Sequence, residues 1–134
     1  MPVAQLQTVQ QIYEAFGRGD VPAILAKLAQ DVDWEYGGGS TDVPWLQPRR
    51  GRERVAGFFA ALTGVDFHTF APKAFFESGP TVVVLVDLEA TVRATGRRFV
   101  EVDEVHIWHF DAAGLVSAFC HRADTHRQWA AYHG

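Results

Sequence analysis

The second half of the sequence is made of four long stretches of strand-forming residues that are separated by short turns. The stretches cover residues 66–77, 81–93, 98–110 and 115–124, and the turns contain Ser78-Gly79-Pro80, Thr95-Gly96 and residues 111–114. Such a pattern predicts β-strands that short turns join into an antiparallel meander. A sheet of this kind buries one face, so the first half of the chain is expected to cover it.

The first half has helical spacing. Apolar side chains recur every 3 to 4 residues from Leu6 to Phe16, and Asp20 can cap a second helix that ends near Leu28. A short strand is expected over 32–36 and a third helix over about 52–62. We therefore expect an α+β fold, in which a cone-shaped, curved antiparallel sheet wraps on N-terminal helices and leaves a pocket between them.

Composition limits the domain count and the class of partner. A chain of 134 residues with 48% apolar and 21% charged residues suits one globular domain over 1–134. Twelve Lys and Arg against sixteen Asp and Glu give a net charge of −4, which argues against nucleic acid. With Cys120 as the one cysteine, no basic and apolar leader, and no membrane-length apolar run, we expect a cytoplasmic protein without membrane contact.

Three segments carry a resemblance to a known family. They are Tyr13-Glu14-Ala15-Phe16 followed by Gly19-Asp20, then Asp31-Val32-Asp33-Trp34, and the late stretch Val105-His106-Ile107-Trp108-His109-Phe110 with Gly114. Together they resemble SnoaL-like domains of the nuclear transport factor 2-like superfamily, which also holds ketosteroid isomerases and limonene epoxide hydrolases. The resemblance covers nearly the whole chain and implies the cone-shaped fold, a homodimer that uses the outer sheet face, and a hydrophobic small molecule as ligand.

The superfamily's activities differ, so function depends on the site. The three catalytic positions of ketosteroid isomerases fall here on Ile12, Tyr36 and His106, none of which matches the residue expected there. Arg93 lies too near a hairpin turn to complete the set of an epoxide hydrolase. In SnoaL-type polyketide cyclases, a histidine and an aspartate act as acid and base, and by position His106 and Asp124 correspond to them.

Strand alternation supplies the other candidates. Val100, Val102, Glu104, His106, Trp108 and Phe110 share one face of an ideal strand. A two-residue turn at Thr95-Gly96 would place Asp87 opposite Glu104, although one extra residue between Gly96 and His106, relative to ketosteroid isomerases, suggests a bulge. His121 and Asp124 are expected on opposite faces, and the resemblance favours Asp124 in the pocket.

Aromatic residues are expected to form the apolar wall of the pocket. Those residues are Trp34, Tyr36, Phe58, Phe59 and Trp108, whose alternative role is plain core packing. Trp45, in a loop rich in glycine and proline, would then be a flap over the pocket or part of a solvated loop. Gly37-Gly38-Gly39 opens no helix with a phosphate-binding lysine, so no nucleotide loop is expected.

Two functions remain open from the sequence. One is cofactor-free acid and base chemistry, such as isomerisation or cyclisation, on a hydrophobic carbonyl compound, with Asp124 and His106 as catalytic residues. In that case Glu104 and His121 would join the aromatic wall in binding the substrate. The other is a non-catalytic ligand-binding or dimerisation module of the same fold. No metal site is assigned, because the six histidines show no ligand spacing on a helix.

Overall fold

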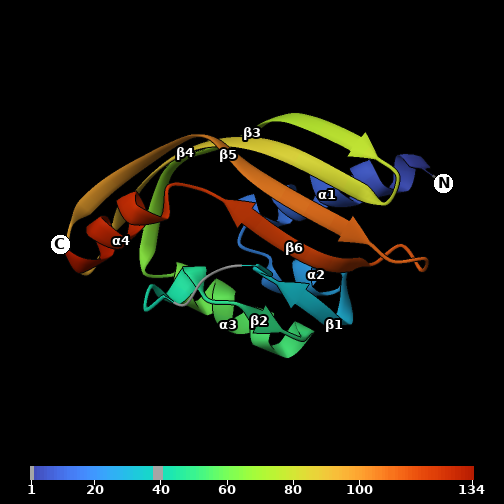
Figure 1. Ribbon diagram of the computed structural model, residues 1–134, viewed down its shortest axis with the longest axis horizontal. Helices are drawn as coiled ribbons and strands as arrows, with labels where there is room; N and C mark the ends of the chain where they lie inside the picture. The colour runs from blue at the N-terminus through green and yellow to red at the C-terminus, as the bar shows by residue number, and fades with distance from the viewer. Residues whose placement is uncertain (1, 38–40) are drawn as a thin grey trace.

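The structure is a computed structural model that describes residues 2–37 and 41–134, so Gly38 and Gly39 lie outside the described residues. The helices are α1 (Pro2–Gly17), α2 (Val21–Leu25), α3 (Arg52–Leu62), α4 (Thr125–His133) and the 3-10 turn η1 (Pro44–Leu46). The strands are β1 (Leu28–Trp34), β2 (Arg49–Arg50), β3 (Val65–Ser78), β4 (Thr81–Val92), β5 (Arg97–Phe110) and β6 (Val116–Arg122). Figure 1 shows the long strands arching over α1, α2 and α3.

The described strands form one open sheet in the order β2-β1-β6-β5-β4-β3. The meander β3-β4-β5-β6 is antiparallel as expected, whereas β1 pairs with β6 in parallel and makes the sheet mixed. The concave face is apolar because every second residue of β4 is buried, and Val82, Val84 and Val86 are fully enclosed. The fold is therefore the predicted α+β arrangement of a curved sheet on N-terminal helices.

Local chain signals explain two of the helices. Asp20 accepts a hydrogen bond from the backbone N–H of Ala23 and caps α2, as predicted. Gly51 precedes α3 with a φ of 94°, a left-handed conformation that favours glycine, and its N–H donates to Val32 O at 2.8 Å. This bond ties the start of α3 to β1. The bounds of α3 agree with the prediction.

Several elements differ from the prediction, among them the strand expected over 32–36, which is β1 and spans Leu28–Trp34. The second helix ends at Leu25, because Leu28 is fully buried in β1 and pairs with Val116 of β6. The last strand ends at Arg122, and α4 follows it as a helix that the sequence analysis did not predict. The Thr95 hydroxyl donates to Ala131 O at 2.5 Å, so tertiary contact with the β4–β5 turn holds α4.

A bulge in β5 decides which residues of that strand face inward. The register shifts between the pairs Val86–Glu104 and Leu88–Glu101, and Asp103 has a φ of 58°. The predicted bulge is thus confirmed, but the predicted pairing of Asp87 with Glu104 across the two strands is wrong. Asp87 instead contacts Lys73 at 2.8 Å on the surface.

The same bulge reverses the faces of β5 on its N-terminal side. Glu104, His106, Trp108 and Phe110 are buried as predicted. Val100 and Val102 were expected on that face too, but they are exposed, and Phe99 and Glu101 are buried in their place. Side chains alternate between the two faces of a strand only where no extra residue interrupts it. The predicted orientation is therefore wrong on the N-terminal side of Asp103.

We expect the bulge to depend on a residue that tolerates positive φ at position 103. Asp103→Val should lower the free energy of unfolding by about 1–2 kcal/mol relative to Asp103→Asn, because a β-branched side chain strains the left-handed conformation that asparagine accepts. Both variants lose the Lys73 ion pair, so their difference isolates the backbone. Urea unfolding of the two variants measures it, and equal stabilities would contradict this account.

Candidate functional site

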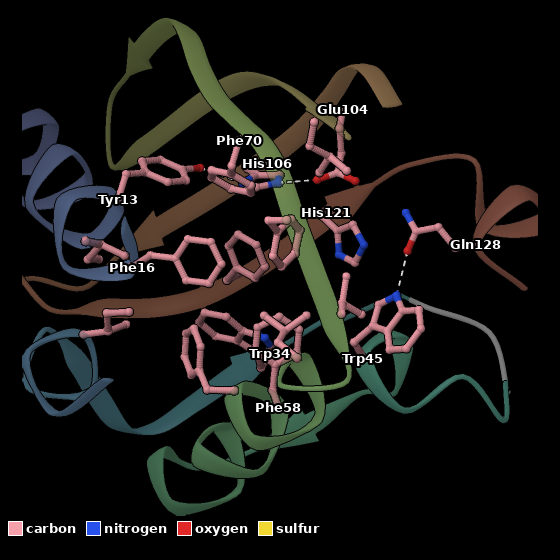
Figure 2. A pocket seen from close by; sticks show the side chains of 18 of the residues that line it. Tyr13, Phe16, Trp34, Trp45, Phe58, Phe70, Glu104, His106, His121 and Gln128 are labelled. Carbon is pink, nitrogen blue, oxygen red and sulfur yellow. Dashed lines mark hydrogen bonds and ion pairs between the residues drawn. The ribbon is translucent and has the colours of Figure 1, made fainter. Parts of the chain in front are cut away.

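A cavity of about 90 Å³ lies between the helices and the concave face of the sheet. Most of its wall is aromatic or aliphatic, and Figure 2 shows how the side chains converge on it from α1, the sheet and α3. Its polar lining comes from Tyr13, Glu104, His106, His121 and Gln128. A small set of polar groups in an apolar enclosure is typical of a small-molecule site.

Tyr13, His106 and Glu104 form one hydrogen-bonded chain. The Tyr13 hydroxyl lies 2.6 Å from His106 Nδ1, and His106 Nε2 lies 2.6 Å from Glu104 Oε2. Glu104 and His106 face the same side because they are two residues apart on β5. Trp108 Nε1 donates to the Tyr13 oxygen at 3.1 Å, on the far side from the carboxylate.

The charge state of Glu104 affects which atom donates in each of these hydrogen bonds. If Glu104 is ionised it can only accept, so His106 Nε2–H donates to it and Nδ1 is left to accept the Tyr13 proton. Burial raises the pKa of Glu104, but the hydrogen bond from His106 and the charge of His121 outweigh it, so that pKa lies below its ordinary value. Burial holds the pKa of Tyr13 well above its ordinary value. With a neutral His106 ring, the three groups are a phenol, an imidazole and a carboxylate.

Glu35 and His121 form a second pair. Glu35 is 5% exposed, and its carboxylate accepts from the His121 backbone N–H at 2.8 Å and lies 2.5 Å from His121 Nδ1. It reaches His121 because β1 ends at Trp34 and Glu35 takes a φ of 60°, which turns its side chain off the polar face of the strand. The histidines of the two pairs thus face one cavity, with ring centroids of His106 and His121 6.1 Å apart, whereas Glu35 itself does not line it.

The charges around His121 favour its protonated form. Burial alone lowers the pKa of this imidazole, but the hydrogen bond that the ring donates to Glu35 and the charges of Glu35, Glu104 and Glu101 outweigh burial, and the pKa is raised above its ordinary value. The raised pKa favours the protonated ring of His121, whose counter-charge is Glu35.

Trp45, Gln128 and Glu101 close the end of the cavity near α4. Trp45 Nε1 donates to Gln128 Oε1 at 2.8 Å, as Figure 2 shows, and Gln128 Nε2 donates to Glu101 Oε2 at 3.0 Å. Trp45 is 5% exposed, so the expected flap is a packed part of the wall. The network holds η1 and α4 against the sheet.

Seven of the predicted site residues line the cavity. They are Trp34, Phe58, Phe59, Glu104, His106, Trp108 and His121. Tyr36 does not, because its hydroxyl lies 2.6 Å from His109 Nε2, away from the cavity. Asp124 does not either: its side chain is 47% exposed and accepts from the Arg127 N–H as the N-cap of α4. The predicted position of Asp124 is wrong because β6 ends two residues before it, and His121 faces inward instead.

Sequence reasoning did not assign Tyr13, Glu35 or Gln128 to the site. Tyr13 was placed on the apolar stripe of the first helix, where its hydroxyl carried no separate signal. Glu35 was assigned to the polar face of a strand, and alternation cannot reveal a left-handed residue. Gln128 lies beyond the last predicted element. Among the polar residues of the site, Glu104 and His106 could be placed on one face from strand alternation, because they are two residues apart.

The described ranges 2–37 and 41–134 contain no group of three His, Cys, Asp or Glu side chains that could hold a metal ion. In the same ranges, no helix has the length and apolar character needed to cross a bilayer.

The profile of the SnoaL-like domain family matches residues 9–119. The chain belongs to the SnoaL-like domain family. A nuclear transport factor 2-like protein of unknown function from Burkholderia pseudomallei K96243 is 31% identical, with 98% of both chains covered and a TM-score of 0.84. Among curated proteins, none matches the sequence.

Two further solved structures show how widely this SnoaL-like fold is shared. A candidate polyketide cyclase from Xanthomonas campestris pv. campestris is 20% identical, with 98% of each chain covered and a TM-score of 0.74. TerC, crystallised with polyporic acid, is 23% identical, with 98% of this chain and 99% of that chain covered and a TM-score of 0.74. At these identities the likeness concerns the fold.

The charge on His121 should depend on Glu35. In Glu35→Gln we expect the pKa of His121 to fall below 6.5, its ordinary value, because burial is then opposed by fewer charges. The Glu35–His121 pair contributes fully to the free energy of unfolding at pH values below 6.5. This contribution is lost as the pH rises through the raised pKa of His121 in the folded protein. Unfolding free energy against pH should lose this dependence in Glu35→Gln.

NMR titration of the histidine rings measures the shift of His121 directly. Asp42→Asn is the matched control, since Asp42 lies 2.9 Å from the more exposed His133 and should leave His121 unchanged. An unchanged His121 titration in Glu35→Gln would contradict the pairing.

Proposed function

We propose that this SnoaL-like domain catalyses proton transfer next to the carbonyl group of a hydrophobic small molecule, without a cofactor. The observation that carries the proposal is that His106 and His121, each paired with a carboxylate, line one apolar cavity together with Tyr13 and Glu104. One pair can receive a proton through Tyr13, and the other holds a positive charge. Acid and base groups of different charge in one enclosure are the usual requirement for such chemistry.

The base is the chain Tyr13–His106–Glu104. In the proposed step, the C–H bond beside the carbonyl breaks and its proton passes to the Tyr13 oxygen, while the Tyr13 proton passes to His106 Nδ1. The C–H electron pair forms the new carbon–carbon double bond, and the carbonyl π pair moves onto oxygen. Glu104 stabilises the imidazolium that forms, through the bond at 2.6 Å. Reversing the transfer at another atom completes an isomerisation.

His121 is the proposed partner of the developing oxyanion. Nδ1 is held by Glu35 at 2.5 Å, which leaves Nε2–H as the donor available to a ligand. A fixed cation in an apolar enclosure stabilises negative charge more strongly than it would in water. Tyr13 and His121 are thus the catalytic residues that touch substrate, while His106 and Glu104 act through Tyr13.

The apolar wall supports a hydrophobic substrate. Trp34, Trp108 and Phe119 pack against one another with ring centroids 4.3–6.0 Å apart and offer flat surfaces to a ring-bearing ligand. TerC, with the same fold, was crystallised with polyporic acid, which agrees with such a ligand. A binding module without chemistry would need this wall but not the two charged pairs.

We also propose that two copies of the chain pair through the outer face of the sheet, in the cytoplasm, as the sequence predicted. Val100 and Val102 are 41% and 68% exposed on β5, and exposed apolar side chains on a sheet face are typical of an interface.

Exchange of hydrogen for deuterium at the benzylic carbon of phenylacetone tests the proposal. The protein should accelerate exchange, and His106→Gln or Tyr13→Phe should lower that rate by about 10²-fold or more, since positioned proton transfer contributes this much. The rate should fall as pH rises through the raised pKa of His121, because the cation is then lost. NMR in D₂O follows the exchange.

Asp124→Asn serves as the control for this assay, because asparagine also caps helices and the side chain lies outside the cavity. Its exchange rate should equal that of the wild type. If phenylacetone binds but exchanges no faster than in buffer, the domain is a binding module and the catalytic proposal fails.

A further inference from the structure

A second hollow lies against the cavity between α1 and β3. It has a volume of about 670 Å³, opens to solvent, and shares Tyr13, Phe16, Phe67 and Phe70 with the cavity. Figure 2 shows Tyr13, Phe16 and Phe70 on one side of the cavity, opposite Trp45 and Gln128. The two spaces are therefore neighbours, and these four aromatic side chains separate them.

The four rings contact one another without hydrogen bonds between them. Ring centroids are 4.9 Å apart for Phe16 and Phe70, 5.7 Å for Phe16 and Phe67, and 6.1 Å for Tyr13 and Phe70. All four side chains are half-buried. A flat apolar ligand can replace such ring contacts without leaving a buried polar group unpaired.

The backbone beside this partition is irregular. β3 pairs with β4 and forms one edge of the sheet, and its register shifts between Phe67 and Thr69 and again between Pro72 and Ala74. Phe70 therefore lies between two bulges on an edge strand. Bulges bend a strand and are frequent beside binding sites, and these two bulges interrupt β3 on either side of Phe70.

The size of the inner cavity limits what it can hold. At about 90 Å³ it is smaller than the roughly 150 Å³ apolar cavity that holds benzene in an engineered protein. A carbonyl group and its neighbouring carbon fit this space, a first ring reaches the partition, and a second ring extends past it. Tyr13 lines both spaces, so a ligand whose carbonyl group lies beside Tyr13 would place its far ring in the hollow.

We infer that the hollow between α1 and β3 is a substrate subsite that binds the flat, apolar part of an elongated carbonyl compound, whose reacting end lies beside Tyr13. This inference rests on the proposed function. Phe75 and Pro72 form its outer wall and supply apolar contact. Gln10, Glu14 and His68 also line the hollow, and the acidic Glu14 disfavours a carboxylate on the bound part of the substrate.

Two ketones of different length test the subsite. Phenylacetone carries one ring, and 1-(biphenyl-4-yl)propan-2-one carries a second ring that reaches the hollow. The longer ketone should bind the wild type about tenfold more tightly or better, because burying a further ring contributes that much. Isothermal calorimetry measures both affinities.

Phe75→Ser should remove the advantage of the longer ketone and leave the affinity for phenylacetone unchanged. Phe76→Ser is the matched control, since the neighbouring Phe76 is 56% exposed and lies outside the hollow, and it should alter neither affinity. Gly17→Trp is a second variant that spares the core. Gly17 lines the hollow and a side chain there meets open space, so the indole should fill the hollow and exclude the second ring.

Equal affinity of the wild type for both ketones would overturn the subsite, as would equal effects of Phe75→Ser and Phe76→Ser. The proposed function fails separately, when His106→Gln leaves the exchange of phenylacetone unchanged. Loss of length preference in Phe75→Ser and Gly17→Trp, with exchange of the short ketone retained, supports the subsite.

Discussion

The structure depends on burying Glu104 and Glu35, each paired with a histidine of an aromatic cavity. A carboxylate taken out of water must accept hydrogen bonds from a paired group or it takes up a proton instead. Glu104 is paired with His106, and Glu35 is paired with both the backbone and the ring of His121. His121 needs Glu35 as much as the reverse, because a buried imidazolium without a counter-charge is also costly. The two pairs thus fix the side chains around which the apolar wall packs.

Backbone irregularities orient both carboxylates toward their histidines. Among the residues that the structure describes, Glu35 and Asp103 are the two non-glycine residues with positive φ. Glu35 turns its own side chain inward at the end of β1, and Asp103 forms the bulge beside which Glu104 faces the concave surface. Strained conformations of this kind cost stability and persist where the surrounding contacts enforce them. Their position at the two buried carboxylates agrees with a site in which orientation matters more than the regularity of the sheet.

The sequence was informative wherever periodicity was uninterrupted. The bounds of α3 and the lengths of the four meander strands follow from apolar spacing and turn residues, to within about two residues at each end. Glu104, His106 and Trp108 were placed on one face because no bulge separates them. Val100 and Val102 were misplaced by the bulge, and Asp124 by the early end of β6. Glu35 and α4 were missed because a left-handed residue and a helix held by tertiary contacts leave no periodic signal.

The proposed function requires that Tyr13 donates a hydrogen bond to His106 and that His106 donates one to Glu104. The most direct measurement is nitrogen-resolved NMR of the His106 ring in the ligand-free protein near neutral pH. The account predicts a proton on Nε2, donated to Glu104, and an unprotonated Nδ1 that accepts the hydroxyl proton of Tyr13. A proton on Nδ1 with a bare Nε2 would contradict it, because Glu104 would then lose its donor and Tyr13 could not pass its proton to the ring.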